Sequence, residues 1–169
     1  LEFSRGSPPK FHIINLKELI SEIIIILRYN DKVPLEAQFE EDIAPDQKIL
    51  GDSDALKQAF NNLIFNALEA SLARGDTKEP IRVQIYSGET SYQGKPYISV
   101  SVKDWGRGIL PKDQNNIFHE FYTTKSAGTG LGLAVVKNII ESHNGKIDFE
   151  TEPGRGSIFK VLLPRAHMP

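Results

Sequence analysis

The stretch Thr123–Leu133, TTKSAGTGLGL, decides how the rest of the sequence is interpreted. It places alternating glycines directly before residues 131–142, whose apolar spacing predicts a helix. Backbone without side chains ahead of a helix N-terminus exposes N–H groups and a positive dipole end, which favour phosphate. The groups available for such contacts are the backbone at Gly128, Gly130 and Gly132, the ammonium of Lys125, and the hydroxyls of Thr123, Thr124 and Thr129. The alternative is a flexible glycine-rich hinge that holds no ligand.

Two other glycine-rich phosphate sites do not fit this stretch. A dinucleotide-binding turn of the G-x-G-x-x-G type needs a third glycine where this chain has Leu133. It also needs a buried strand before the glycines, and FYTTKSA has no such character. A P-loop needs the arrangement G-K-[ST], which does not occur in the sequence.

Composition narrows the class of protein. A chain of 169 residues, 40% of them hydrophobic, suffices for one compact domain with its own core, but not for two catalytic domains. The net charge of -2 provides no basic field for a nucleic-acid backbone, and the absence of cysteine excludes disulfides and thiolate metal sites. The longest apolar run, Ile23–Leu27, is far below the roughly 18 residues of a spanning helix. We therefore expect a soluble, cytoplasmic chain, whose parent protein can still be membrane-anchored.

The periodic pattern predicts helices alternating with mostly antiparallel strands, and a meander is the simplest pairing. Residues 1–9 are expected to be a linker or an expression-derived leader, residues 10–164 the domain, and residues 165–169 a tail. Helices are predicted over 15–29, 52–73 and 131–142, with a short one near Asn115, and residues 106–129 are expected to form a long loop. Strands are predicted over 33–39, 48–50, 81–86, 97–102, 146–151 and 157–163.

An unusual pair of asparagines lies on the predicted helix 52–73. Asn62 and Asn66 are four residues apart and therefore share one face, and Glu69 continues the same stripe. Asparagine is a poor helix former, and apolar residues already supply the core face of this helix. An amide oxygen is a hard ligand suited to Mg²⁺ that also takes oxygens from phosphates. The alternative is a pair of surface asparagines.

Asp104 directly follows a predicted apolar strand. An ionised carboxylate only accepts hydrogen bonds, so at a buried strand end it would select a donor such as the exocyclic amine of adenine and reject guanine. Gly106 and Gly108 would let the backbone approach the ring. The alternative is a turn between two elements.

Five segments in this order resemble the N, G1, F, G2 and G3 boxes of sensor histidine kinases: NNLIFNALEAS, DWGRGI, IFHEFYTTK, GTGLGLAVVKNIIESHNGKI and EPGRGSIFKVLLP. The resemblance covers residues 15–164, and FYTTK is most similar to the nitrogen-regulation and sporulation-type branch. It implies the GHKL (Bergerat) fold, an α/β (α+β) two-layer sandwich with a mixed, mostly antiparallel sheet, helices on one face and a mobile ATP lid. It also implies ATP and Mg²⁺ as cofactors and transfer of the γ-phosphoryl group to a histidine.

The resemblance also implies roles for individual residues. Asn66 would be the metal ligand, Asn62 would contact the metal–phosphate region, and Lys125 would complete the catalytic set. Asp104 would bind the adenine amine. The implied nucleotide-binding set as a whole is Asn62, Asn66, Glu69, Ala70, Asp104, Gly106, Gly108, Ile109, Tyr122, Thr124, Lys125, Gly128, Thr129, Gly130, Leu131, Gly132, Leu133 and Ser157.

Some positions depart from the family pattern or extend it. Glu69 stands where the family often has a lysine, which leaves more charge neutralisation to Lys125 and the metal. Asn62 stands where gyrase-type and chaperone ATPases carry a glutamate that activates water, and an amide cannot take that proton. This difference favours a kinase that does not waste ATP. Phe118 and Phe121 are implied as anchors of the lid.

The family's phosphoacceptor motif, His-Glu or His-Asp with proline four residues after the acid, is not found in this chain. His119 precedes Glu120, but no proline follows, and His12, His143 and His167 are expected to be surface or capping residues. The resemblance therefore implies a separate dimerising acceptor hairpin and a response regulator as partners, with a monomeric fragment and a homodimeric parent. The alternatives are a GHKL ATPase or protein serine kinase, and a nucleotide-sensing pseudokinase.

Overall fold

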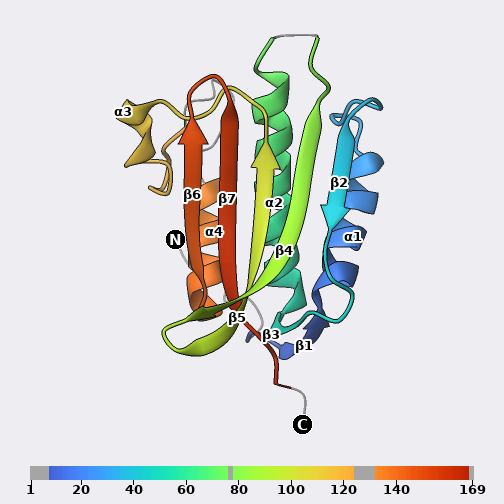
Figure 1. Ribbon diagram of the computed structural model, residues 1–169, viewed down its shortest axis with the longest axis vertical. Coiled ribbons are helices and arrows are strands. Elements are labelled where there is room, and N and C mark those ends of the chain that lie inside the picture. Colours follow the sequence, from blue (N-terminus) through green and yellow to red (C-terminus); the bar gives the residue numbers. More distant parts are fainter. Residues whose placement is uncertain (1–7, 76–77, 124–131, 168–169) are drawn as a thin grey trace.

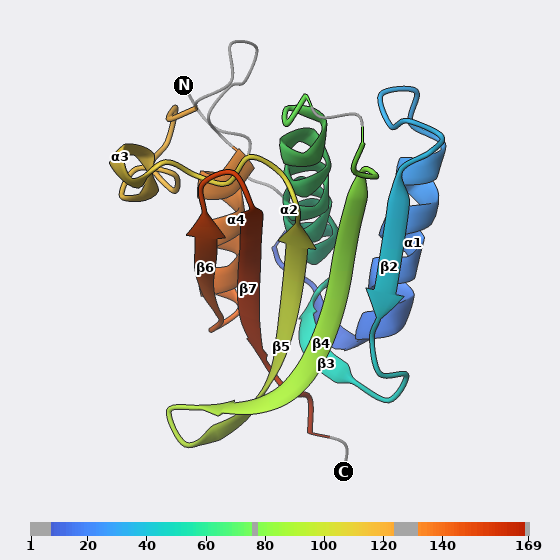
Figure 2. The same cartoon turned by 45° about the horizontal axis from the view of Figure 1, so that its top comes forward.

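The structure is a computed structural model that describes residues 8–75, 78–123 and 132–167. A five-stranded sheet forms one layer, and the long helices cover one of its faces (Figures 1 and 2). The strands lie in the order β2-β4-β5-β7-β6, and among them only β2 and β4 run parallel. The expected two-layer sandwich with a mixed, mostly antiparallel sheet is confirmed.

The elements follow one another closely along the chain. The strands of the large sheet are β2 (Gln38–Asp42), β4 (Arg82–Tyr92), β5 (Lys95–Asp104), β6 (Lys146–Glu152) and β7 (Gly156–Pro164). The helices are α1 (Leu16–Arg28), α2 (Ser53–Leu72), α3 (Pro111–Gln114) and α4 (Gly132–Ser142). A separate two-stranded antiparallel sheet joins β1 (Phe11–Asn15) to β3 (Lys48–Asp52).

Both long N-terminal helices begin at side chains that cap them. The Asn15 carboxamide accepts a hydrogen bond from the Glu18 N–H at 3.1 Å, and the Asp52 carboxylate accepts from the N–H groups of Asp54 and Ala55 at 3.0 and 3.1 Å. Such caps satisfy helix N–H groups that have no partner within the helix and contribute about 1 kcal/mol each. The predicted helix starts are therefore confirmed.

The core lies between the sheet and the helices, and α2 is its centre. Phe60, Leu63 and Ile64 on α2 are 0 to 1% exposed and face the inner residues of β4 and β5. Full burial of each such side chain stabilises the fold by about 1.5–3 kcal/mol. The apolar stripe of α2 therefore fixes the helix against the sheet, and this sets the position of every other side chain that α2 carries.

Two predictions about strands are wrong. The strand expected over 33–39 begins only at Gln38, because backbone N–H groups of Val33 and Ala37 bond to carbonyls three residues earlier and form turns. Leu35, which would have pointed into a sheet, is 96% exposed. The simple meander is also wrong, since β7 lies between β5 and β6.

The hairpin of β4 and β5 is longer than expected. Its turn has positive φ at both central residues, Gln93 (50°) and Gly94 (74°), which is the geometry of a tight two-residue hairpin turn. The hairpin continues past the rest of the sheet (Figure 2). On β4 the predicted strand ends at Tyr86, and residues 87–92, which are half-buried or exposed, lack an apolar alternation. On β5 the prediction leaves out residues 95–96 and 103–104, although Asp104 is buried.

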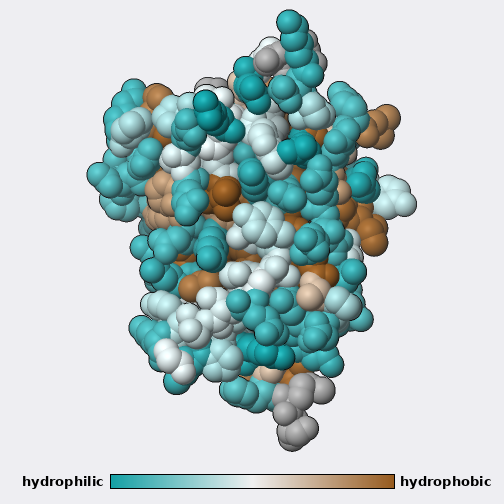
Figure 3. All heavy atoms as spheres, in the orientation of Figure 1, coloured by the Kyte–Doolittle hydropathy of each residue, from teal (hydrophilic) through white to brown (hydrophobic). Residues whose placement is uncertain are grey.

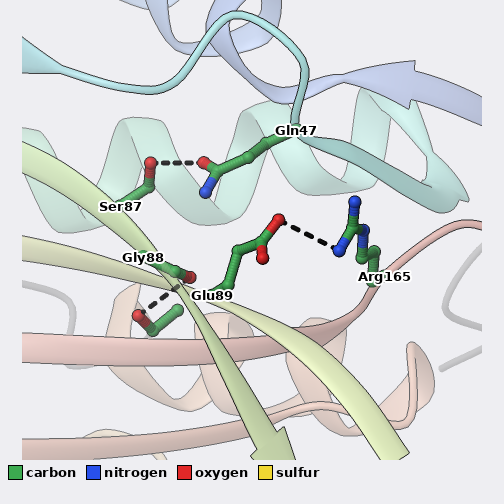
Figure 4. A network of polar contacts seen from close by, with 6 residues as sticks. Gln47, Ser87, Gly88, Glu89 and Arg165 are labelled. Atoms are coloured by element: carbon green, nitrogen blue, oxygen red, sulfur yellow. Dashed lines mark hydrogen bonds and ion pairs between the residues drawn. The ribbon is translucent and has the colours of Figure 1, made fainter.

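A network of polar contacts surrounds the segment that leads into β3 (Figure 4). Gln47, only 4% exposed, accepts a hydrogen bond from the Ser87 hydroxyl, and its backbone carbonyl accepts from the Leu16 N–H at 3.0 Å. Arg165 pairs with Glu89 at 3.0 Å, and the following N–H, of Ala166, bonds to the Lys48 carbonyl at 2.8 Å. These contacts tie β4 to β3 and to the residues that follow β7.

The face of the sheet turned away from the helices is mostly polar (Figure 3). The alternation along β5 and β7 places Lys103 and Lys160 on it, whereas their neighbours Val102 and Val161 are 1% and 0% exposed. None of the helices in the described part of the chain has the length and apolar character needed to cross a membrane.

Candidate functional site

Three polar side chains form a row across one end of the sheet. Asp104 on β5 lies opposite Ser157 on β7, which in turn lies opposite Thr151 on β6. Residues directly opposite one another in antiparallel strands point to the same face. The alternation with buried Val102 and Phe159 shows that this is the helix-covered face. The row therefore lies at the upper edge of the core, beside the C-terminal end of α2.

The Asp104 carboxylate is buried but remains hydrogen-bonded. The residue is 4% exposed, and its Oδ1 accepts from the Gly106 N–H at 2.9 Å, while the Ser157 N–H also donates to the carboxylate. Burial raises the pKa of Asp104 to about 6, and the two backbone hydrogen bonds limit the rise. At neutral pH the group is therefore mainly ionised, a buried acceptor aimed along the row.

Three glycines allow the backbone around Asp104 to pack directly against other backbone segments. A Cβ on Gly106 would lie 2.5 Å from the carbonyl carbon and oxygen of Ala70 on α2. A Cβ on Gly156, whose φ is +120°, would lie 2.2 Å from the Asp104 carbonyl oxygen. Gly108, with φ +70°, is equally tight against the Glu152 carbonyl at 2.3 Å. No other residue fits these positions, so the segment after β5 is held against both α2 and the β6–β7 hairpin.

Hydrogen bonds hold the segment that follows Asp104 in place. The Arg74 guanidinium donates to the Trp105 carbonyl at 2.8 Å, and the Gly154 N–H donates to the Arg107 carbonyl at 2.7 Å. Further along, the Ile109 N–H donates to the Thr151 hydroxyl at 2.9 Å. The Trp105 ring also carries the Arg82 guanidinium, 3.5 Å from its centroid. These contacts hold the loop against the end of α2 and the β6–β7 hairpin where it passes Asp104.

The asparagine stripe of α2 leads from this row toward the start of α4. Asn62 and Asn66 are both half-buried, and the Asn62 amide nitrogen lies 3.5 Å from the Gly132 carbonyl oxygen. Glu69, also half-buried, lies one turn beyond Asn66 and next to Ala70, which contacts Gly106. One helix therefore connects the Asp104 end of the site to the first residue of α4. Leu133, the next residue, packs against the core.

Of the two phenylalanines expected to anchor the lid, Phe118 packs on the core and Phe121 does not. Phe118 is half-buried and packs on Phe149 and Phe159, with ring centroids 5.9 and 6.4 Å away, and Lys137 of α4 lies over its ring. Phe121, in contrast, is 73% exposed with φ 62°, so the prediction that it anchors this segment is wrong in this structure.

Tyr122 is held by a neighbour of its own segment. The phenol donates a hydrogen bond to Asp113, and this bond raises the pKa of Tyr122. The ring packs against the core. The remaining residues of the expected nucleotide set and of the expected lid lie outside the described residues: Thr124, Lys125, Gly128, Thr129, Gly130 and Leu131.

Sequence reasoning missed Thr151, Gly156 and Arg74. Arg74 follows the predicted helix 52–73, and Gly156 lies between the predicted strands 146–151 and 157–163, so no local pattern shows that both contact the Asp104 segment. Thr151 had one signal: it was the last residue of a predicted strand whose partner begins at Ser157. Pairing those two strand ends would have placed its hydroxyl beside Ser157.

For His143, expected at the surface or as a cap, the surface alternative is wrong, since the residue is 3% exposed. Its Nδ1 bonds to the Ile139 carbonyl at 2.7 Å, and its Nε2 accepts from the Asp52 N–H at 3.0 Å. The ring also stacks on Phe11, with centroids 4.8 Å apart. His143 therefore joins the C-terminal end of α4 to the cap of α2, the two helices that border the site.

Comparison with known proteins agrees with this arrangement. Residues 51–167 match the family described as histidine kinase-, DNA gyrase B-, and HSP90-like ATPase. The chain is 34% identical to the signal transduction histidine-protein kinase AtoS of Escherichia coli K12, over 97% of this chain and 26% of that protein. It is 39% identical to sporulation kinase A of Bacillus subtilis 168, over 90% of this chain and 23% of that protein.

A solved structure gives the same result for the fold. The nucleotide-free catalytic domain of histidine kinase ThkA is 33% identical and superposes with a TM-score of 0.72, covering 92% of this chain and 96% of that domain. The chain spans about a quarter of the length of the two curated relatives. It belongs to the histidine kinase-, gyrase B- and HSP90-like ATPase family, as the ATP-binding catalytic domain of a two-component sensor histidine kinase.

Proposed function

We propose that this domain binds Mg-ATP with adenine at Asp104 and transfers the γ-phosphoryl group to a histidine on a separate acceptor hairpin of the parent kinase. The observation that carries the proposal is the Asp104 carboxylate, which is 4% exposed yet ionised at neutral pH and lies at the edge of the core. A buried acceptor of this kind is matched by the exocyclic amine of adenine. Gly106 and Gly108 leave the backbone beside it free of side chains.

The asparagine stripe supports a metal and phosphate site at the other end. Amide oxygens of Asn66 and Asn62, with the Glu69 carboxylate, are the hard oxygen donors that Mg²⁺ prefers, so the donor set fits. Asn66 would be the ligand from the protein, and Mg²⁺, when bound, supplies neutralisation of phosphate charge. Lys125 and the backbone of residues 128–133 are proposed to hold the phosphates, because glycine-rich backbone before α4 exposes N–H groups.

The chemistry that this chain performs is positioning. The base end is fixed by Asp104 and the phosphate end by α2 and the start of α4, so the γ-phosphoryl group is presented outward in one orientation. Asn62 cannot accept a proton at neutral pH, so it does not activate water in the way a carboxylate does. This favours transfer to a supplied nucleophile over hydrolysis.

The nucleophile is proposed to lie in the rest of the parent kinase. His119, the histidine followed by an acid, is exposed and lies on the segment after α3, and His143 is occupied by two hydrogen bonds. The expected partners are the parent's own dimerising hairpin and then a response regulator. The curated relatives, about four times as long, leave room for such domains.

Binding can be tested with the intrinsic reporter that the site contains. Trp105, the single tryptophan of the chain, directly follows Asp104, so its fluorescence can follow titration with Mg-ATP. Asp104→Ala should weaken binding at least tenfold, whereas Asp148→Ala, on the outer face of β6, should leave it unchanged. Equal affinity of Asp104→Ala and wild type would refute the adenine role.

Transfer is tested by adding an acceptor hairpin from a related kinase together with labelled Mg-ATP. Acid-labile label on the hairpin, lost on mutation of its histidine, is the expected result. Acid-stable label would indicate a serine kinase, and rapid phosphate release by the domain alone would indicate an ATPase. Binding without any transfer would favour the nucleotide-sensing module, for which Glu69 in place of the family lysine is the argument.

A further inference from the structure

We infer that Thr151 determines base specificity by fixing the direction of the Ser157 hydroxyl, so that Ser157 acts as a second acceptor beside Asp104. This inference rests on the proposed function, since it concerns the base end of the same nucleotide site. Thr151 is a positioning residue: it does not contact the nucleotide itself but acts on it through Ser157.

The Thr151 hydroxyl has three polar neighbours. The Ile109 N–H donates to its oxygen at 2.9 Å, and the hydroxyl donates to the Gly156 carbonyl at 3.2 Å. The third neighbour is the Ser157 hydroxyl, whose oxygen lies 2.8 Å from that of Thr151. Thr151 is half-buried and Ser157 is 6% exposed. The two hydroxyls are therefore ordered by protein groups.

Counting hydrogens sets the direction of each bond. A hydroxyl has one hydrogen and two lone pairs. The Gly156 carbonyl and the Ile109 N–H each allow one direction only, so Thr151 donates to the first and accepts from the second. All three contacts are then hydrogen bonds at once only if Ser157 donates its own hydrogen to Thr151. Its remaining lone pairs are left for another group, and Ser157 offers an acceptor only.

The position of Ser157 places its free acceptor beside the Asp104 carboxylate. Ser157 lies directly opposite Asp104 on the neighbouring strand, and its own N–H donates to the Asp104 carboxylate. Two acceptors thus stand side by side at one end of the sheet. The 6-amino group of adenine carries two N–H donors and matches this pair, whereas a 6-oxo purine presents a carbonyl to two acceptors.

Valine at position 151 would keep the shape of threonine and remove the hydroxyl. The Ser157 hydroxyl could then rotate and donate, and a 6-oxo base would gain a hydrogen bond that the wild type denies it. One neutral hydrogen bond of about 1 to 1.5 kcal/mol corresponds to roughly a tenfold change in affinity. Loss of the Ile109 contact would weaken all nucleotides alike, because it does not depend on the base.

The experiment compares dissociation constants for ATP and inosine triphosphate, with Mg²⁺, in four proteins. In the wild type we expect a clear preference for ATP. Thr151→Val should narrow the ratio of the two constants by about tenfold, and Thr151→Ser should retain the wild-type ratio. Thr90→Val is the matched control: Thr90 lies opposite Tyr97, at the far end of the hairpin from Asp104, so the ratio should not change.

A double-mutant cycle provides a second readout that survives a loss of stability in one variant. Ser157→Ala should also narrow the ratio, and adding Thr151→Val to it should change the ratio no further, because the two residues act in one chain. If Thr151→Val weakens both nucleotides equally, or widens the ratio, Thr151 does not set the polarity and the inference is wrong. If the wild type binds neither nucleotide, the proposed function itself is refuted.

Discussion

The Asp104 carboxylate and the Gly106 N–H are joined by a 2.9 Å hydrogen bond in a place where only 4% of the aspartate is exposed. The bond closes a short backbone turn over the carboxylate and replaces part of the hydrogen bonding to water that burial removes. The replacement is incomplete, since the pKa of Asp104 is still raised from 3.8 to about 6. The domain therefore keeps a charge that its own fold disfavours.

Replacing that charge should stabilise the nucleotide-free domain. A pKa rise from 3.8 to about 6 corresponds to about 3 kcal/mol at neutral pH. Asp104→Asn removes this cost but pairs with only one of the two N–H donors. We expect the free energy of unfolding at pH 8 to increase by about 1 to 2 kcal/mol in urea denaturation, while binding of Mg-ATP falls at least tenfold. Asp148→Asn should change neither, and a destabilised Asp104→Asn would contradict the assigned burial cost.

From the raised pKa of Asp104 we expect opposite pH dependences for stability and for base binding. The folded pKa of Asp104, about 6, lies above the unfolded value of 3.8, so the folded state holds the proton more tightly. Its contribution to stability is fully present below pH 3.8 and is lost as the pH rises through 6. The stability advantage of Asp104→Asn should therefore shrink as the pH falls from 8 toward 4.

Binding of the base should instead weaken as the pH falls below about 6, because the carboxylate becomes protonated. Adenosine is the suitable probe, since it has no phosphates that titrate in this range. Competition with a fluorescent nucleotide between pH 5 and 8 should show the loss in the wild type. A constant affinity of adenosine across this range would argue against a carboxylate contact.

Gly106→Ala tests the contact between the Asp104 segment and α2. Its Cβ would lie 2.5 Å from backbone atoms of Ala70, which cannot yield as a flexible side chain does. We expect a loss of stability of about 1 to 3 kcal/mol, typical of overpacking, and weaker adenine binding as Asp104 shifts. Gly88→Ala is the matched control in β4, because there a Cβ meets only the Ser99 hydroxyl at 3.4 Å. Similar losses for both variants would show that the effect is not steric.

His143 should be worth more to stability than a surface histidine. His143→Leu leaves the Asp52 N–H without its side-chain acceptor, and an unsatisfied polar group costs about 1 to 3 kcal/mol. The Ile139 carbonyl keeps the Ser142 hydroxyl and the N–H of residue 143 as donors. His143→Gln can still place an acceptor near the Nε2 position, so thermal denaturation should show a smaller loss. His12→Leu, at an exposed position, is the control. Equal effects of Leu and Gln at position 143 would show that the bond to Asp52 contributes little.

Local features of this domain were predictable where the cause is local. The caps Asn15 and Asp52, the helical stripe with Asn62 and Asn66, and the position of Asp104 at a strand end all follow from residues close in sequence. The insertion of β7 between β5 and β6 does not, because it depends on packing between strands some fifty residues apart. Thr151 was missed for this reason: its role exists only once β6 and β7 bring it beside Ser157. The strand prediction for residues 33–39 was wrong for another reason: the backbone there forms turn hydrogen bonds in spite of its alternating apolar pattern.

The tight contact between Gly106 and Ala70 means that α2 fixes the distance between the two ends of the site. The helix holds Asn62 at one end of the site and Ala70, which abuts the Asp104 segment, at the other, and eight residues at 1.5 Å each give about 12 Å. Because the helix cannot stretch and the contact at Gly106 cannot slide, the distance between the proposed base end and the proposed metal end is set by the number of residues between them. One residue inserted between Asn66 and Ala70 would lengthen this distance by about 1.5 Å and turn the asparagines by about 100°. A nucleotide would then reach one end of the site or the other, but not both.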